Sequence, residues 1–237
     1  MLNLQLNFYA FICTRSEELS STTNELLSYL SSAGVETKLL IGKNSIFTAY
    51  EEAFNEVNPK DNDIIILCHD DIEILNSLEH FKRILTELAM TRSTGFIGPA
   101  GTACLTNDGV WWNQRLWKEG RHRGYVVHGN KVHPEYTFYG MPGRVVVLDG
   151  LFLAAKASTI RRIGGLSKPP YFPGAWDFYD LHYTLEAHLH GYANQVPPLF
   201  IRHESHGELA GRGSWHVNRE AFVKHKFLDK NMPAYFI

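Results

Sequence analysis

Residues 64–71, Ile64-Ile65-Ile66-Leu67-Cys68-His69-Asp70-Asp71, decide the predicted fold. A short apolar run this rich in β-branched residues predicts a strand that is buried on both faces. Because carboxylates are costly to bury, we expect Asp70 and Asp71 at the exposed tip of that strand. Ligand sites in open α/β sheets lie outside such strand ends, and carboxylate oxygens suit Mg²⁺ or Mn²⁺, which in turn bind phosphates. The alternative is that the two aspartates cap a following helix.

Strands and helices alternate on either side of this stretch. We expect strands over residues 4–14, 36–41, 63–69 and 95–99, and helices over 16–32, 47–57 and 76–91, the first capped by Ser16. This alternation predicts a mostly parallel sheet covered by helices. The first strand is not followed by GxGxxG, and GxxxxGK[ST] occurs nowhere, which disfavours dinucleotide oxidoreductases and P-loop NTPases.

The second half of the chain differs from the first in composition. Residues 100–143 carry few helix signals and are expected to be irregular, with Trp111, Trp112 and Trp117 among cationic side chains. Such aromatic rings stack on sugars or on single-stranded nucleic acid, unless they are tucked inward as packing residues.

Three further strands or helices carry polar residues of interest. We expect a strand over 145–155 with Asp149 and Gly150 in its middle, and a helix from residue 156 to the glycines at 164–165. A second helix runs to residues 191–192 with Asp180 in its first turn, where a carboxylate suits the helix dipole or serves as a general base. A last strand over 196–202 ends at His203. If this end neighbours that of strand 63–69, His203 completes a metal site with Asp71.

The composition limits the class of protein. A net charge of −2 gives no general drive towards nucleic acid or anionic lipid, and no nucleic-acid partner is expected. Three widely spaced cysteines argue against a disulfide scaffold and favour a reducing compartment, with the thiols as small packing residues. The longest early apolar run, residues 8–13, is far too short to span a membrane. We therefore expect a cytoplasmic protein, with peripheral membrane contact left open.

In order, these motifs resemble a GT-A-fold glycosyltransferase of the inverting family 2 type, closest to the glycosyltransferase-like (StrF-like) subgroup. Six segments carry the resemblance: 64–72 (strand and modified DxD motif), 98–101 with Trp111-Trp112, 148–154 (donor-sugar strand), 178–192 (ED-type segment), 203–205 (late metal histidine), and Trp215 with 222–227. The resemblance implies one α/β GT-A domain over 1–237, with a mixed, mostly parallel central sheet flanked by helices. Residues 1–100 would form the nucleotide-binding half, and 101–237 the donor-sugar and acceptor half with a C-terminal helical tail.

The resemblance also implies roles for individual residues. Asp71 and His203 would bind Mn²⁺ or Mg²⁺, and Asp180 would be the general base. The nucleotide-sugar would contact Thr14, Arg15, His69, Asp70, Asp149 and Gly150. The implied reaction is metal-dependent, inverting transfer from a nucleoside-diphosphate sugar, with uridine as the commonest base, to a glycan, lipid-linked or protein acceptor. Two departures stand out: His69 replaces the first DxD aspartate, and His182 replaces the second acidic residue of the ED-type segment.

Three alternatives remain open at the level of sequence. A metal-dependent hydrolase could use the same carboxylates and histidines, although all-helical His-Asp hydrolases place them on helices. A nucleotidyltransferase usually has a Gly-rich basic loop near its start, which residues 15–18 do not provide. A non-catalytic carbohydrate- or nucleic-acid-binding module would not need Asp71, Asp180 and His203 together. The sequence carries no signal for the oligomeric state.

Overall fold

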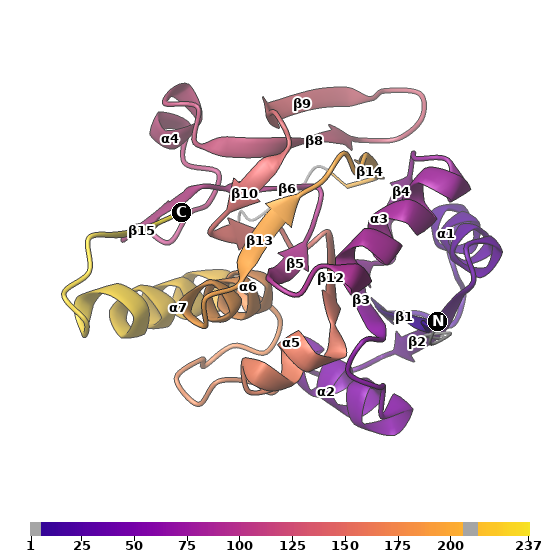
Figure 1. Ribbon diagram of the computed structural model, residues 1–237, viewed down its shortest axis with the longest axis horizontal. Coiled ribbons are helices and arrows are strands. Elements are labelled where there is room, and N and C mark those ends of the chain that lie inside the picture. Colours follow the sequence, from indigo (N-terminus) through magenta and orange to yellow (C-terminus); the bar gives the residue numbers. More distant parts are fainter. Residues whose placement is uncertain (1–5, 206–212) are drawn as a thin grey trace.

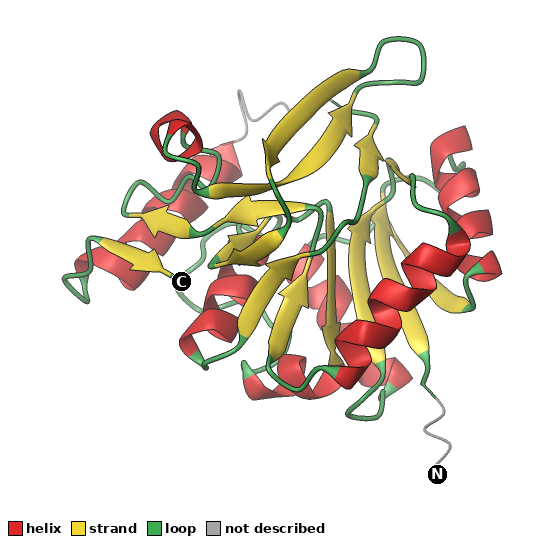
Figure 2. Cartoon of the chain, turned by 45° about the horizontal axis from the view of Figure 1, so that its top comes forward, coloured by secondary structure: helices red, strands yellow, loops and turns green. Residues whose placement is uncertain are grey.

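A seven-stranded sheet forms the centre of the computed structural model, which describes residues 6–205 and 213–237 (Figures 1 and 2). The strand order is β10 (Gly143–Val145), β13 (Ala193–Val196), β5 (Thr94–Ile97), β12 (Phe152–Lys156), β3 (Ile64–His69), β1 (Phe8–Thr14) and β2 (Val35–Ile41). The pairings set five strands in one direction and reverse only β10 and β12. The mixed, mostly parallel α/β sheet expected from the sequence is confirmed.

Helices cover both faces of this sheet. Buried side chains of α1 (Ser21–Ser32) and α3 (Leu78–Met90) pack on one face, and those of α2 (Ile46–Val57), α5 (Ala157–Arg162) and α6 (Tyr179–Leu189) pack on the other. Successive residues of β3 alternate between these two cores: Ile64 and Ile66 join the first, while Ile65 and Leu67 join the second. Strand β3 is therefore buried on both faces, as its composition predicts.

A second sheet lies against the end of the first (Figure 2). It has the order β11 (Val147–Leu148), β6 (Ala100–Thr102), β8 (His122–His128), β14 (Ile201–His203) and β4 (Ile72–Ile74), and β9 (Glu135–Gly140) pairs with β8 as a hairpin. The chain crosses repeatedly between the two sheets, and β3 leads directly into β4 across residues 70–71. The residues at these crossings line the junction of the sheets, and several candidate site residues are among them.

The C-terminal part packs beside the second half of the molecule. Helix α7 (Gly213–Val223) runs into a short π-helix, η1 (Lys224–Leu228), and β15 (Ala234–Phe236) pairs with β7 (Cys104–Thr106). The structure thus adds a terminal strand to the expected helical tail. Within residues 6–205 and 213–237, none of the helices has the length and apolarity that crossing a membrane requires.

The first helix begins later than expected. It is capped by Ser20, whose hydroxyl accepts a hydrogen bond from the backbone N–H of Thr23 at 3.0 Å, so the prediction of a cap at Ser16 is wrong. Ser16 instead accepts from the backbone N–H of Glu18 at 3.0 Å in a local turn. Residues 4–5 of the expected first strand lie outside the described part of the chain.

Three other expectations in the second half are corrected. Residues 100–143 are not irregular, because they contain β6, β7, β8, β9 and α4 (Gln114–Lys118). The strand expected over 145–155 breaks twice: at residue 146, between β10 of the central sheet and β11 of the second sheet, and at residues 149–151, where the chain returns to the central sheet in β12. The strand expected over 196–202 is split between β13 and β14 by Pro197-Pro198, since proline cannot donate to a strand ladder.

Asn194 ties the middle of the fold together and gives a test of it. Its side chain is fully buried, accepts from the N–H of Phe96 at 2.9 Å, and donates to the carbonyls of Val146 (2.7 Å) and Thr184 (2.6 Å). We expect Asn194→Ala to lower the free energy of unfolding by about 2–4 kcal/mol, because each buried group left without a partner costs about 1–3 kcal/mol. Urea denaturation measures this, with the exposed Asn55→Ala as the control. A loss under about 1 kcal/mol would contradict this account.

Candidate active site

The crossing from β3 to β4 brings two distant parts of the chain together. Because β4 pairs with β14 in antiparallel register, the end of β14 lies beside the crossing, and the backbone N–H of Glu204 donates to the carbonyl of Asp71 at 2.9 Å. The hydroxyl of Thr23 donates to the carbonyl of Asp70 at 3.0 Å and so anchors the crossing to α1. The aspartates lead into a strand, and α3 is capped by Ser77, so the alternative that they cap a helix is wrong.

Three side chains at this crossing form a candidate metal site. Nitrogens of His69 and His203 and a carboxylate oxygen of Asp71 all lie within 4.8 Å of one another. Asp71 Oδ1 is 3.3 Å from His203 Nε2 and 3.8 Å from His69 Nδ1. Burial alone would raise the pKa of Asp71, but the hydrogen bond and charge of His203, with His69 and Ser205, outweigh it and lower that pKa to about 2. The carboxylate is therefore ionised and ready to bind a cation at any physiological pH.

The turn from β11 to β12 forms the opposite wall. Its centre, Gly150, lies against α6: an added Cβ would be 2.5 Å from the hydroxyl oxygen of Tyr179 and 3.1 Å from the Cβ of Asp180. The N–H of Gly150 donates to Asp180 Oδ2 at 3.0 Å, and its carbonyl accepts from the Tyr179 hydroxyl at 2.9 Å. The N–H of His69 donates to the carbonyl of Leu151 at 3.1 Å, which joins this turn to the metal-site crossing. A glycine is required here by close approach, as the sequence suggests.

Two carboxyl groups of this wall have shifted acidities. Burial and then the charge of Asp149 raise the pKa of Asp180 to about 7, against the lowering effect of backbone N–H groups that include that of Gly150. Burial also raises the pKa of Asp149, and the electrostatic effects of His69 and His203 and of backbone N–H groups oppose this shift. Two neighbouring carboxyls do not ionise together easily, so one of them holds a proton near neutral pH. A carboxyl with a pKa near 7 is suited to general base catalysis.

The segment before α6 is held by α7. The side-chain oxygen of Asn218 accepts from the N–H of Gly174 at 2.7 Å, and its amide donates to the carbonyl of Asp177 at 2.9 Å. Phe178 takes the left-handed conformation, with φ of 69°, and its ring packs 5.6 Å from that of Trp215. A non-glycine residue in this conformation is uncommon, and the aromatic packing holds it in place. This turn sets the direction from which Asp180 enters the cleft.

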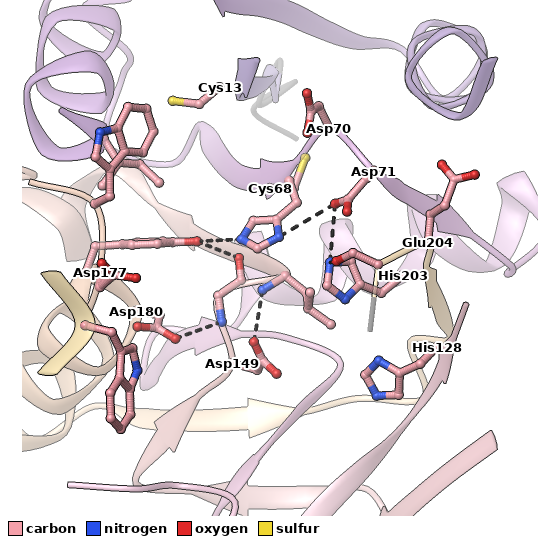
Figure 3. A pocket seen from close by; sticks show the side chains of 18 of the residues that line it. Cys13, Cys68, Asp70, Asp71, His128, Asp149, Asp177, Asp180, His203 and Glu204 are labelled. Carbon is pink, nitrogen blue, oxygen red and sulfur yellow. Dashed lines mark hydrogen bonds and ion pairs between the residues drawn. The ribbon is translucent and has the colours of Figure 1, made fainter. Parts of the chain in front are cut away.

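All nine residues predicted from the sequence line one cleft of about 1250 Å³. They are Thr14, Arg15, His69, Asp70, Asp71, Asp149, Gly150, Asp180 and His203. Figure 3 shows Asp71 facing His203 on one side and Asp180 reaching the glycine turn on the other. The structure brings these residues together; the role of each remains a prediction.

The cleft contains further residues that sequence reasoning missed. Tyr179 precedes Asp180 in the sequence, and Ser205 lies two positions after His203. Closeness in sequence to a predicted site residue is the only feature of the chain that points to either of them. His128 has no such signal: it is the register partner of His203 across β8 and β14, and their ring centroids are 6.0 Å apart. A pairing between strands so distant in sequence is not readable from the chain.

The three tryptophans of residues 100–143 differ in how deeply they are buried. Trp111 is buried in the core, while Trp112 is partly buried and Trp117 is 41% exposed. All three reach the cleft, together with Trp176 and Trp215. The alternative of inward packing therefore holds for Trp111, and the others offer aromatic faces at the cleft.

Two residues that could be taken for reactive groups are not. His182 packs against Tyr171 and Phe172, and burial lowers its pKa to about 4, so it is a neutral packing residue on the far side of α6 from the cleft lining. Cys13 reaches the cleft, but burial raises its pKa to about 12 and keeps it a thiol.

The comparisons with known proteins give the family and the fold of the chain. The sequence profile described as "Glycosyltransferase like family" matches residues 10–224, and the chain belongs to this family, which is of the family 2 type. No curated protein sequence matches the chain.

Solved structures give the fold. The crystal structure of GalNAc-T7 with UDP, GalNAc and Mn²⁺ aligns with a TM-score of 0.57 at 11% identity, covering 94% of this chain and 49% of that one. The chain thus spans about half the length of that protein. A197 from STIV aligns with a TM-score of 0.48 at 15% identity over 83% of this chain and 85% of its own. The fold is that of GT-A glycosyltransferases, and family and fold together support a glycosyltransferase.

The raised pKa of Asp180 makes a prediction about stability. Its folded pKa of about 7 exceeds the unfolded value of about 3.9, so the folded state holds the proton more tightly. The contribution of Asp180 to the free energy of unfolding therefore falls as pH rises from about 4 to about 7, and the loss persists above that range. Relative to wild type, Asp180→Asn should gain roughly 1–3 kcal/mol over this range, less than the full shift implies because the carboxyl borders the cleft.

Urea denaturation at a series of pH values measures this gain. The exposed Asp229→Asn serves as the control and should show no such trend. A stability difference between Asp180→Asn and wild type that does not change with pH would contradict the shifted pKa.

Proposed function

We propose that this protein is a metal-dependent, inverting glycosyltransferase. It would move a sugar from a nucleoside-diphosphate sugar, most simply a UDP-sugar, to a hydroxyl of a glycan, lipid-linked or protein acceptor. The observation that carries the proposal is the cleft shared by the cluster of His69, Asp71 and His203 and by the carboxyl of Asp180. The UDP and Mn²⁺ named for GalNAc-T7 support this choice of donor and ion.

The candidate metal site fits a divalent cation by its donor chemistry. Two imidazoles and one ionised carboxylate suit Mn²⁺ better than Mg²⁺, which prefers oxygen ligands. His69, Asp71 and His203 would hold this ion, which would neutralise charge on the diphosphate leaving group. His69 thereby takes a ligand role, in place of the ribose or diphosphate contact that the resemblance implies.

Asp180 is the proposed general base. As the acceptor oxygen forms its bond to the anomeric carbon, the bond from that carbon to the diphosphate oxygen breaks. The acceptor proton passes to Asp180, and the electron pair of the broken bond leaves with the diphosphate. Burial, and then the charge of Asp149, hold the pKa of Asp180 near neutrality, which matches the base to its task. One displacement from the opposite face inverts the anomeric configuration.

The remaining lining residues divide between donor and acceptor. Thr14, Arg15 and Asp70 are proposed to contact the nucleotide, and the backbone of Gly150 is proposed to border the donor sugar. A cleft of about 1250 Å³ has room for a nucleotide-sugar and part of an acceptor. Aromatic faces at Trp112, Trp117, Trp176 and Trp215 support a sugar as the acceptor group, because indole rings pack on the apolar faces of pyranoses.

The same proposal includes a cellular location and a division of the domain into two halves. The three free cysteines agree with a reducing, cytoplasmic location. We also keep the division into a nucleotide-binding half, 1–100, and a donor-sugar and acceptor half, 101–237, within one domain.

Nucleotide binding tests the metal dependence. A ligand at 100 times its dissociation constant stabilises a protein by about 2.7 kcal/mol, which raises Tm by several degrees. UDP, GDP, ADP, CDP and dTDP would be compared by thermal shift, each with and without Mn²⁺. We expect UDP with Mn²⁺ to stabilise wild type and Asp229→Asn, and to leave Asp71→Asn unshifted because its charged ligand is lost. A metal-independent shift, or none with any nucleotide, would contradict the proposal.

Transfer chemistry tests the role of Asp180. UDP-sugars would be incubated with a panel of nitrophenyl glycosides, and the products identified by NMR. We expect glycoside-dependent release of UDP, an inverted anomeric linkage, and a rate that rises with pH through about 7. Asp180→Asn should lower kcat by about 10²- to 10⁴-fold, while Asp229→Asn should not. Free sugar formed regardless of glycoside would indicate a hydrolase, and near-normal transfer by Asp180→Asn would exclude this base.

A further inference from the structure

The hydroxyl of Tyr179 lies between the two walls of the cleft. Its oxygen is 2.9 Å from the carbonyl oxygen of Gly150 and 3.2 Å from Nε2 of His69. The side chain is buried, with 5% of the residue exposed. Its hydroxyl therefore touches both the glycine turn and a residue of the candidate metal site through hydrogen bonds.

The direction of these two hydrogen bonds follows from the groups themselves. A carbonyl oxygen only accepts, so the single hydroxyl proton of Tyr179 goes to the buried carbonyl of Gly150. The tyrosine oxygen is then an acceptor towards His69, and Nε2 of His69 must carry a hydrogen. The reverse direction would take the hydroxyl proton away from a buried carbonyl, which costs about 1–3 kcal/mol.

The consequence appears on the other nitrogen of the same ring. In a neutral imidazole with its hydrogen on Nε2, Nδ1 carries a lone pair. That nitrogen lies 3.8 Å from the carboxylate oxygen Oδ1 of Asp71, so two electron-rich atoms are on the same side of the ring. A cation bound by both would make this arrangement favourable, and hydrogen bonds to the remote nitrogen are the usual means of orienting a metal-binding histidine.

We propose that Tyr179 is a positioning residue that fixes the tautomer and orientation of His69 for binding a divalent cation through Nδ1. This proposal rests on the proposed function. The same hydroxyl joins the metal site to the general base, since the peptide group of Gly150 accepts from Tyr179 and donates to Asp180. One hydrogen-bonded chain therefore sets the positions of a metal ligand and of the proposed base relative to each other.

The chain offers a matched control one helical turn away. Tyr183 is also buried on α6, and its hydroxyl donates to the carbonyl of Leu166 at 2.6 Å, whereas that of Tyr179 donates to the glycine turn. Tyr179→Phe and Tyr183→Phe each remove one buried hydroxyl and one hydrogen bond to a carbonyl. A general loss of packing or stability should therefore affect both variants, whereas loss of the His69 tautomer should affect only Tyr179→Phe.

The first test is the affinity for Mn²⁺ in the presence of UDP, measured by electron paramagnetic resonance of free Mn²⁺. Removing such a partner of a metal-binding histidine weakens metal binding by about 10- to 100-fold. We expect this loss in Tyr179→Phe, and wild-type affinity in Tyr183→Phe. Equal affinity in wild type and Tyr179→Phe would overturn the positioning role alone. Absence of Mn²⁺ binding in wild type would overturn the metal-dependent function, and this role with it.

The second test needs no metal, and its decisive result comes from the wild-type protein. Nitrogen-15 NMR of wild-type protein labelled at histidine distinguishes the two neutral tautomers, and comparison with His69→Asn assigns the signals. We expect His69 to carry its hydrogen on Nε2 in wild type, and to exchange between tautomers in Tyr179→Phe. A wild-type His69 with its hydrogen on Nδ1 would overturn the proposal.

Discussion

The passage of the chain from one sheet to another at Asp70-Asp71 is the constraint on which the candidate site depends. Strand β3 is buried in the central sheet on both faces, and three residues later β4 belongs to the second sheet. The aspartates must therefore lie at the junction, where water and ligands have access. Since β4 pairs with β14, the same crossing brings in His203 from the far end of the sequence.

The turn at residues 149–151 is the second crossing, and it makes the other wall. Here the constraint is steric as well as topological, because only a glycine at 150 lets α6 approach with Tyr179 and Asp180. Bringing Asp180 beside Asp149 in a partly enclosed place raises the pKa of its carboxyl. Burial that is unfavourable for folding alone thus gives the proposed base a pKa near neutrality.

The two walls have opposite electrostatic character. Around Asp71, imidazoles favour the ionised carboxylate and create a place for a cation. Around Asp180, a neighbouring carboxylate and burial favour the protonated form. Environments that push apart the acidities of similar groups mark acid-base assignments in enzymes. The Tyr179 hydroxyl and the backbone of Gly150 connect these environments, so their relative placement is built into the fold.

The sequence by itself determined the central sheet, the position of Asp70-Asp71 at a strand end, and Asp180 in the first turn of a helix, because these follow from local hydrophobic pattern and helix-end chemistry. It misjudged the 145–155 strand and residues 100–143, where strands belong to a second sheet whose pairings are distant in sequence. Only the tertiary structure decided that His128 lies beside His203, that Trp111 is buried, and that Tyr179 bridges the walls. Such contacts depend on strand order and register, which no local pattern encodes.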